Sequence, residues 1–251
     1  MSLVEETLFG TVDKVQMAIE RLKTFEPPEG YYLAFSGGKD SQCIYHLAEM
    51  AGVKFDAHYN ITGIDPPELV RFIRKNYPNV KRHLPKETIW HLIKRKHMPP
   101  TRMKRYCCEF LKEANGGGRR VVTGIRQTES VKRSKRKMVE QCFKDKSKTY
   151  INPIIDWTED DVWEFIKPYT HCSLYDEGFK RLGCVGCPNS NIKKAFERWP
   201  KIAAQWKRSI FKAWSKREDG RKGFSTPEKM WNWYVSGSSY CDYPDQTVMF
   251  E

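Results

Sequence analysis

The chain has 251 residues, of which 39% are hydrophobic, and a formal net charge of +13 at pH 7. This size allows one full domain, with room for a small second one. No run of about 18 apolar residues is present, which excludes a membrane-spanning helix, and residues 1–25 lack the pattern of a signal peptide. We therefore expect a cytoplasmic protein with no membrane partner, whose charge suits anionic ligands.

Apolar residues recur near helical spacing at the start of the chain, which predicts an N-terminal helix over residues 1–28. Beyond it, short apolar runs alternate with helical patterns. The runs of strand length are 31–35, 55–61, 80–84, 119–124 and 151–155, and helical patterns follow residues 41, 66, 88 and 158. Strands that alternate with helices predict an α/β fold, a Rossmann-like parallel sheet flanked by helices.

From residue 191 onward, aromatic residues recur at helical spacing, which is more often the pattern of a helical core than of a ligand cage. We therefore expect a helical C-terminal region over residues 191–251, with an irregular tail from residue 236. The main domain is expected over residues 29–190. It contains the two motifs described next.

The segment SGGKDS lies between the first predicted strand and a predicted helix. Its glycines let backbone N–H groups approach an oxyanion closely, and the start of the helix adds unpaired donors and a positive dipole. It is neither a Walker loop nor the dinucleotide fingerprint. The complete string favours an oxyanion loop over an ordinary turn, and its candidate binding residues are Ser36, Gly37, Gly38, Lys39, Asp40 and Ser41.

Four of the eight cysteines form two tight pairs, Cys107–Cys108 and Cys184–Cys187. Disulfides are rare in the cytosol, and four thiolates can instead hold an iron–sulfur cluster or one zinc ion. Adjacent cysteines are unusual around structural zinc. The pair Cys184–Cys187 alone could be a redox dithiol, which would leave the other pair unexplained. The scattered cysteines are expected to be small buried hydrophobes, and they are Cys43, Cys142, Cys172 and Cys241.

The positive charge is concentrated in two stretches. Residues 71–105 contain twelve Lys or Arg and a single acid, Glu87, and residues 132–137 form a second basic run. Such runs are either solvated surface or the footprint of a nucleic acid. No nucleic-acid-binding motif accompanies them, and both interpretations remain open.

The glycine-rich string resembles the pyrophosphate loop of the adenine-nucleotide α-hydrolase superfamily. A tandem Cys-Cys with a Cys-x-x-Cys that begins 76 positions after Cys108 resembles the iron–sulfur subset of the PAPS and APS reductase family. Residues 123–130 (TGIRQTES) and 152–163 resemble two further segments of that family. The resemblance covers about residues 30–190, and it implies an adenine nucleotide (APS, PAPS or ATP) and a [4Fe–4S] cluster on the four paired cysteines.

The resemblance also implies roles for single residues. Gly124 and Arg126 would lie by the nucleotide, at the strand end where α/β sheets bind ligands, and Asp65 would face it from another strand end. In ATP-cleaving members the loop aspartate helps to hold magnesium, so Asp40 is a conditional Mg²⁺ ligand. Trp157 and Trp163 are expected to pack in the core.

Sulfonucleotide reductases attack the sulfate sulfur with a thiolate in a C-terminal Glu-Cys-Gly-Leu-His motif, and thioredoxin then releases sulfite. This chain lacks the motif. Its only tail cysteine, Cys241, stands beside Asp242 with nothing evident to lower its pKa. The first hypothesis is nevertheless a reductase with Cys241 as nucleophile and Lys39 as a catalytic group.

Two other hypotheses remain. One is an ATP-dependent sulfurtransferase, similar to the DNA phosphorothioation enzyme or to transfer RNA thiolation enzymes, which would bind DNA or tRNA through residues 71–105 and 132–137. The other is a protein that binds a nucleotide or a nucleic acid without catalysis.

Overall fold

The computed structural model describes residues 3–7, 10–215 and 224–237, and the chain forms two compact units. The first unit comprises residues 1–60, 67–83 and 114–182, and the second comprises residues 61–66, 84–113 and 183–251. This division differs from the three consecutive segments 1–28, 29–190 and 191–251 expected from the sequence. Both cysteine pairs belong to the second unit, together with the C-terminal helices.

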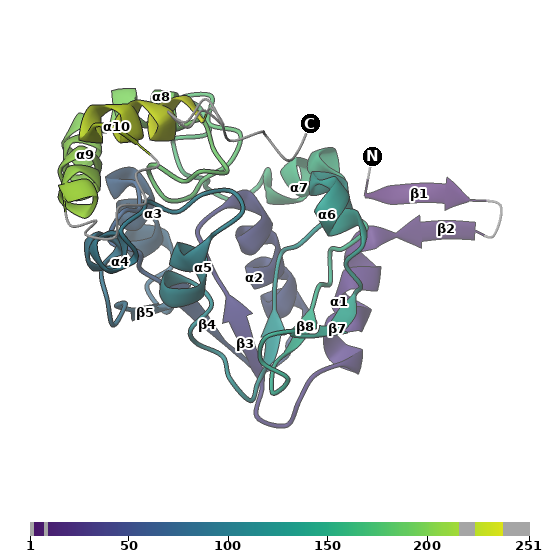
Figure 1. Ribbon diagram of the computed structural model, residues 1–251. Coiled ribbons are helices and arrows are strands. Elements are labelled where there is room, and N and C mark those ends of the chain that lie inside the picture. Colours follow the sequence, from purple (N-terminus) through teal and green to yellow (C-terminus); the bar gives the residue numbers. More distant parts are fainter. Residues whose placement is uncertain (1–2, 8–9, 216–223, 238–251) are drawn as a thin grey trace. The chain divides into compact units, whose positions relative to one another are not determined.

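A six-stranded sheet forms the centre of the first unit (Figure 1). Its strand order is β5-β4-β3-β6-β8-β7, and all neighbours pair parallel except β7, which is antiparallel to β8. The strands are β3 (Tyr31–Ala34), β4 (Phe55–Asn60), β5 (Lys81–His83), β6 (Arg120–Val122), β7 (Val139–Gln141) and β8 (Thr149–Ile151). The predicted α/β fold with a mainly parallel sheet is confirmed.

Apolar burial explains the centre of this unit. Tyr31 and Leu33 of β3 are fully buried, as expected for a parallel strand covered on both faces. The helices of this unit are α1 (Lys14–Thr24), α2 (Lys39–Ala51), α3 (Pro67–Asn76), α6 (Val131–Ser134) and α7 (Glu159–Ile166), with a 3₁₀ turn at Gln127–Glu129. Helix α2, which follows β3, places its apolar side against the sheet and contacts helices α1 and α7.

The N-terminal helix predicted over residues 1–28 is found only in part. Strands β1 (Val4–Thr7) and β2 (Gly10–Asp13) form an antiparallel pair, and α1 begins at Lys14. The side chain of Asp13 accepts the N–H groups of Val15 and Gln16, so it caps the helix at this point. The strand expected over 151–155 is likewise displaced to β8, because Pro153 carries no N–H for a strand ladder.

The second unit is helical. Its helices are α4 (Ile89–Lys96), α5 (Tyr106–Leu111), α8 (Ile192–Arg198), α9 (Pro200–Ser215) and α10 (Pro227–Ser236). Helix α9 packs against α4, α8 and α10, and its Trp206 and Ile210 are almost fully buried. The predicted helical C-terminal part with an aromatic core is confirmed for the residues that the structure describes.

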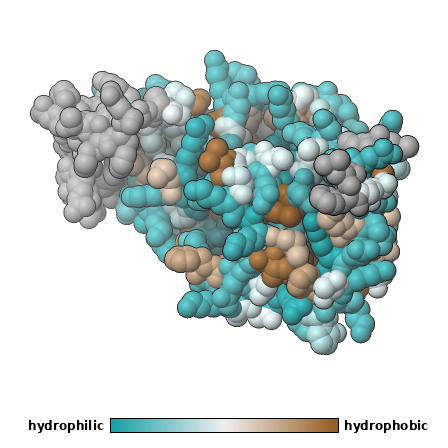
Figure 2. Space-filling view, turned by 90° about the vertical axis from the view of Figure 1, so that its right-hand side faces the viewer, coloured by the Kyte–Doolittle hydropathy of each residue, from teal (hydrophilic) through white to brown (hydrophobic). Residues whose placement is uncertain are grey.

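The face drawn in Figure 2 is mainly polar. Figure 2 shows one face of the molecule, on which hydrophilic side chains predominate and hydrophobic ones form small separate patches. Among the helices of the described residues, none combines the length and the apolar character that crossing a membrane requires.

Candidate functional site

The sheet has a topological switch point at β3. Strand β4 pairs with one side of β3 and β6 with the other, both in parallel. Ligands of open α/β sheets bind beyond the carboxyl ends of the strands at such a point. Residues 36–38 follow β3 and residues 123–126 follow β6. The topology therefore brings the glycine-rich loop together with the predicted residues Gly124 and Arg126.

The loop between β3 and α2 has a fixed shape. Gly37 has a φ of +72°, and a Cβ at this position would lie 2.7 Å from side-chain atoms of Ile73. The hydroxyl of Ser41 accepts the N–H of Ser36 at 3.2 Å and donates to the carbonyl of Gly38 at 2.8 Å. The two glycines and two serines of the motif thus hold the loop against the start of α2.

Gly124 is required for close packing. A Cβ on Gly124 would lie 2.7 Å from the carbonyl oxygen of Asp40, so the chain after β6 touches the first turn of α2 directly. This contact sets the position of the neighbouring Arg126 relative to the loop.

We expect Gly124→Ala to destabilise the protein by about 1–3 kcal/mol, because the added methyl group overpacks this contact. Urea unfolding measures the change. Gly117→Ala is the matched control, since a Cβ there meets its nearest atom, of Asp145, at 3.7 Å. Equal stability of Gly124→Ala and the wild type would contradict this packing.

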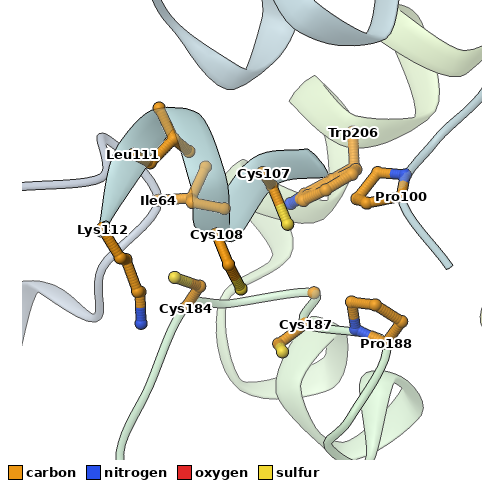
Figure 3. A pocket seen from close by; sticks show the side chains of 11 residues that line it. Ile64, Pro100, Cys107, Cys108, Leu111, Lys112, Cys184, Cys187, Pro188 and Trp206 are labelled. Carbon is orange, nitrogen blue, oxygen red and sulfur yellow. The ribbon is translucent and has the colours of Figure 1, made fainter. Parts of the chain in front are cut away.

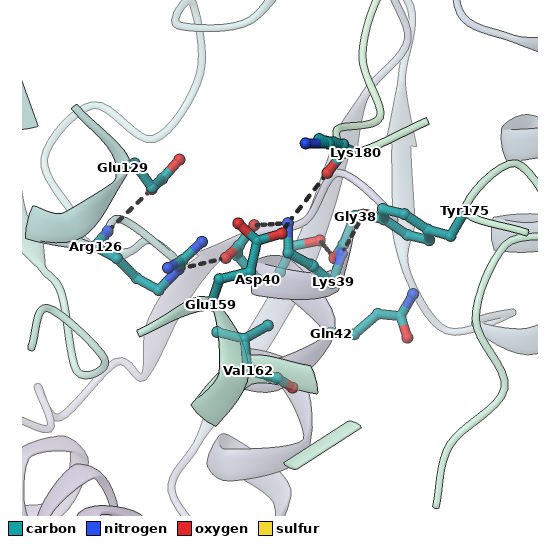
Figure 4. A network of polar contacts seen from close by, with 12 residues as sticks. Gly38, Lys39, Asp40, Gln42, Arg126, Glu129, Glu159, Val162, Tyr175 and Lys180 are labelled. Atoms are coloured by element: carbon teal, nitrogen blue, oxygen red, sulfur yellow. Dashed lines mark hydrogen bonds and ion pairs between the residues drawn. The ribbon is translucent and has the colours of Figure 1, made fainter. Parts of the chain in front are cut away.

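Charged side chains converge beside the loop (Figure 4). Lys39 and Arg126 are only 4% and 3% exposed. The Arg126 Nε donates to Oδ1 of Asp40 at 2.7 Å. The Lys39 Nζ lies 3.9 Å from Oδ2 of Asp40 and 3.5 Å from Oε1 of Glu159. Two buried cations thus stand at the carboxyl edge of the sheet, where they can bind the oxygens of phosphate or sulfate.

Three neighbours of Lys39 were not expected from the sequence. Besides Glu159, these are Tyr175, whose hydroxyl accepts the Lys39 N–H at 2.8 Å, and Lys180, whose carbonyl accepts from Nζ at 3.3 Å. Of these three residues, the sequence gives a signal only for Glu159, which stands in the first turn of the helix predicted after Thr158.

The two tryptophans expected in the core differ. Trp157 is fully buried, which confirms its core role. Trp163 is partly exposed, and its ring centroid lies 5.9 Å from the Lys39 Nζ. It packs edge-on against Tyr175. Trp163 therefore forms part of the wall beside the loop rather than core alone.

The four paired cysteines line one pocket of the second unit (Figure 3). Cys107 and Cys108 lie in the first turn of α5. Gly186, which also lines the pocket, has a φ of +79° and leaves no room for a Cβ beside Trp206. The other residues lining the pocket are Ile64, Pro100, Leu111, Lys112, Gly186, Pro188 and Trp206.

Hydrogen bonds fix the segment that carries Cys184 and Cys187. The Val185 N–H donates to the carbonyl of Ile64 at 2.8 Å, and the indole N–H of Trp206 donates to the carbonyl of Val185 at 3.1 Å. Arg102 donates to the carbonyl of Pro188 at 2.9 Å. These bonds hold the second cysteine pair facing the first.

The surroundings of the pocket shift the pKa values of its thiols in opposite directions. The hydrogen bond to Cys108 and burial raise the pKa of Cys107. A hydrogen bond from the Cys107 thiol lowers the pKa of Cys108 to about 6, and the nearby charges of Lys112 and Arg105 act in the same direction. Burial raises the pKa of the Cys184 thiol, and the ammonium of Lys112 opposes this rise. Thiolates are the form in which cysteine binds metals.

Four thiols around one pocket are a donor set that metals can use. One zinc ion requires four sulfurs, each about 2.3 Å from a common centre, and a cubane cluster binds each cysteine to a different iron. The residues present therefore fit either kind of metal group.

The charge of Asp65 acts on Cys184 of the pocket, whereas the scattered cysteines of the described residues do not line it. Asp65 belongs to the second unit, and its carboxylate accepts the N–H of Thr62 at 2.7 Å; its role at a nucleotide stays a prediction. Cys43 and Cys172 are buried as expected, whereas Cys142 is partly exposed. Cys241 lies outside the described residues.

A mainly parallel sheet with an oxyanion loop at its switch point defines an α/β protein of the nucleotide-binding class. Residues 30–190 match the phosphoadenosine phosphosulfate reductase domain. The chain belongs to this PAPS reductase domain family, whose members bind adenine nucleotides.

Two curated proteins are similar to this chain in sequence. An uncharacterized protein of Methanocaldococcus jannaschii is 30% identical over 188 residues, which are 69% of this chain and 46% of that protein. An adenosine 5'-phosphosulfate reductase of Oceanobacillus iheyensis is 30% identical over 152 residues, 56% of this chain and 60% of that protein. The chain thus spans about half the length of these relatives.

A solved structure supports the fold. The phosphoadenylyl-sulfate reductase from Candida auris, in a phosphate complex, matches with a TM-score of 0.51 and 19% sequence identity. The match covers 66% of this chain and 87% of that chain. At this level of identity the likeness shows the shared architecture alone.

Proposed function

We propose that this chain is a sulfonucleotide-reductase-like enzyme that binds an adenine nucleotide at residues 36–41 and holds a [4Fe–4S] cluster at the cysteine pocket. The placement of buried Lys39 and Arg126 at the switch point supports nucleotide binding most directly. The adenosine 5'-phosphosulfate reductases among the relatives support the choice of reaction.

The loop residues bind and orient the nucleotide. The ammonium of Lys39 and the N–H groups at the start of α2 bind the oxygens of the phosphate and sulfate groups. Arg126 adds a second positive charge, and its pairing with Asp40 at 2.7 Å fixes the direction of the guanidinium. Positive charge at this place also stabilises the nucleoside phosphate as it leaves.

The proposed reaction has two steps. A cysteine thiolate forms an S–S bond with the sulfate sulfur while the bond from sulfur to the phosphate oxygen breaks, and AMP (from APS) or PAP (from PAPS) leaves. The dithiol of thioredoxin then reduces the thiosulfonate, releases sulfite and becomes a disulfide. The enzyme therefore needs one thiol that can reach the nucleotide.

None of the described cysteines of the first unit suits this attack. Cys43 and Cys172 are buried. Cys142 follows β7, whose last residue pairs with the first residue of β8, so it lies at the amino edge of the parallel strands, away from the loop. Cys241 remains our proposed nucleophile for the reductase reaction.

The cysteine pocket would hold the cluster through Cys107, Cys108, Cys184 and Cys187. When bound, such a cluster supplies a redox-active iron–sulfur core with delocalised charge. The cations near the pocket, Lys112 and Arg105, favour the thiolate form of Cys108.

A second candidate is ATP-dependent sulfur transfer to a nucleic acid, and the distribution of charge favours it. The described residues of the second unit include 16 Lys or Arg and six Asp or Glu, a net +10, while the whole chain carries +13. Most of the positive charge thus accompanies the cysteine pocket. In this case ATP would bind the loop with Mg²⁺ held by Asp40, and tRNA or DNA would bind the basic unit.

Sulfite release tests the first candidate. Protein purified without oxygen is given APS and PAPS separately, each with reduced thioredoxin, and Cys241→Ser is assayed in parallel. We expect sulfite from one nucleotide and none from the variant. Absence of sulfite from wild-type protein that carries four irons would overturn the reductase reaction.

Pyrophosphate release tests the second candidate. The same protein is given Mg·ATP with tRNA or with DNA at low and high salt. Nucleic-acid-dependent release that falls steeply with salt would support sulfur transfer. Release that does not depend on nucleic acid would contradict it.

A further inference from the structure

One segment of the first unit binds both polar groups of Lys39. We call residues 172–182 the strap; in the sequence they stand between α7 and the second cysteine pair. Its Tyr175 hydroxyl accepts the backbone N–H of Lys39 at 2.8 Å, and its Lys180 carbonyl accepts from the Lys39 Nζ at 3.3 Å. Figure 4 shows both contacts. The strap therefore occupies a main-chain donor and the ammonium of the same loop residue.

The Lys39 N–H is a donor that an anion would use. Lys39 is the first residue of α2, a helix of 13 residues, and the first N–H groups of a helix point toward a bound anion. Burial raises the pKa of the Tyr175 phenol, so the hydroxyl that accepts this N–H is neutral. A phosphate oxygen would form a charge-assisted bond in its place, about twice as strong as a neutral one.

Little room is left for both acceptors. The Tyr175 hydroxyl would lie 3.4 Å from a Cβ built on Gly38, so it stands directly over the glycine turn. The ring is held by an edge-on contact with Trp163 at 4.9 Å between centroids. A phosphate oxygen that accepts the Lys39 N–H has to take the place of the hydroxyl.

We propose that Tyr175 holds the anion position of the loop and is displaced by a phosphate or sulfate group of the nucleotide. The inference rests on the proposed function, because it concerns the same loop. Tyr175 then lowers the affinity of the loop for anions, because its neutral hydroxyl competes for the Lys39 N–H. Weakly bound anions do not displace this hydroxyl.

Nucleotide binding by Tyr175→Phe tests the inference. The variant keeps the ring against Trp163 and removes only the acceptor. Titration calorimetry with ATP and with PAPS is expected to show affinity raised roughly threefold to tenfold, the range of one neutral hydrogen bond. Tyr169→Phe is the matched control, because Tyr169 stacks on His46 away from the loop, and its affinity is expected to equal the wild type's.

The outcomes separate the inference from the proposed function. If the wild type binds nucleotide and Lys39→Met does not, the proposed binding at the loop is supported. Unchanged or weakened binding by Tyr175→Phe in that case overturns the inference alone. Absence of binding in every variant overturns both.

Hydrogen exchange gives a second measurement on the wild type, which stands even if Tyr175→Phe does not fold. Backbone amides of the strap are expected to exchange faster when ATP or PAPS is bound, since the strap has lost its contacts with Lys39. Equal or slower exchange would contradict displacement.

Discussion

Lys39→Met is expected to weaken binding of ATP and PAPS by about 100-fold or more. A hydrogen bond to a charged group contributes about 1.5–3 kcal/mol, and without the ammonium the carboxylates of Asp40 and Glu159 would face the phosphates with less positive charge to balance them. Methionine keeps the apolar stem of the side chain against Tyr175. Titration calorimetry measures the affinity, and circular dichroism checks that the variant is folded.

The control is Lys23→Met, because Lys23 lies exposed in the last turn of α1. It removes the same charge without touching the loop. A folded Lys39→Met variant that binds within about threefold of the wild type, a difference well under one charged hydrogen bond, would show that the loop does not bind phosphate through this ammonium.

Cys184→Ser is expected to abolish iron binding. Wild-type protein purified without oxygen should contain about four iron and four sulfide per chain, as a [4Fe–4S] cluster requires, and the variant less than about one of each. The reason is geometric, since the bond from Val185 to Ile64 fixes this ligand and no other described cysteine lines the pocket besides the paired four. Metal analysis and visible absorption measure both.

Cys142→Ser serves as the matched control, because Cys142 belongs to the first unit and is expected to leave the iron content unchanged. One zinc per chain in the wild type would contradict the cluster. Full iron in Cys184→Ser would contradict the assignment of the ligands.

The central strands of the sheet could be predicted because they are buried. Parallel strands covered on both faces read as continuous apolar runs, as in β3 and β6. The strands that the sequence did not indicate are short and less buried: β1 and β2 at the N-terminus and β7 at the sheet edge. Exposed strands of three or four residues contain too few apolar positions to show a period.

The loop and Arg126 could also be predicted, since strand ends in an α/β sheet meet at one edge. Tyr175 and Lys180 could not, because each is at least 136 positions from Lys39 in the sequence. A hydroxyl or a carbonyl that accepts a hydrogen bond leaves no pattern in the chain. The four paired cysteines line one pocket, and the resemblance did not indicate that they share a unit with the C-terminal helices.

The division into units constrains how this protein can be manipulated. The chain passes from one unit to the other after residues 60, 66, 83, 113 and 182. No single cut of the chain therefore releases either unit intact. Truncation at residue 190 would remove the helices that support the pocket and would leave all four of its cysteines. The order of synthesis on the ribosome also matters, because Cys107 and Cys108 emerge well before the C-terminal helices of the same unit. Assembly of the cysteine pocket thus waits for translation of α9, whose Trp206 lines it.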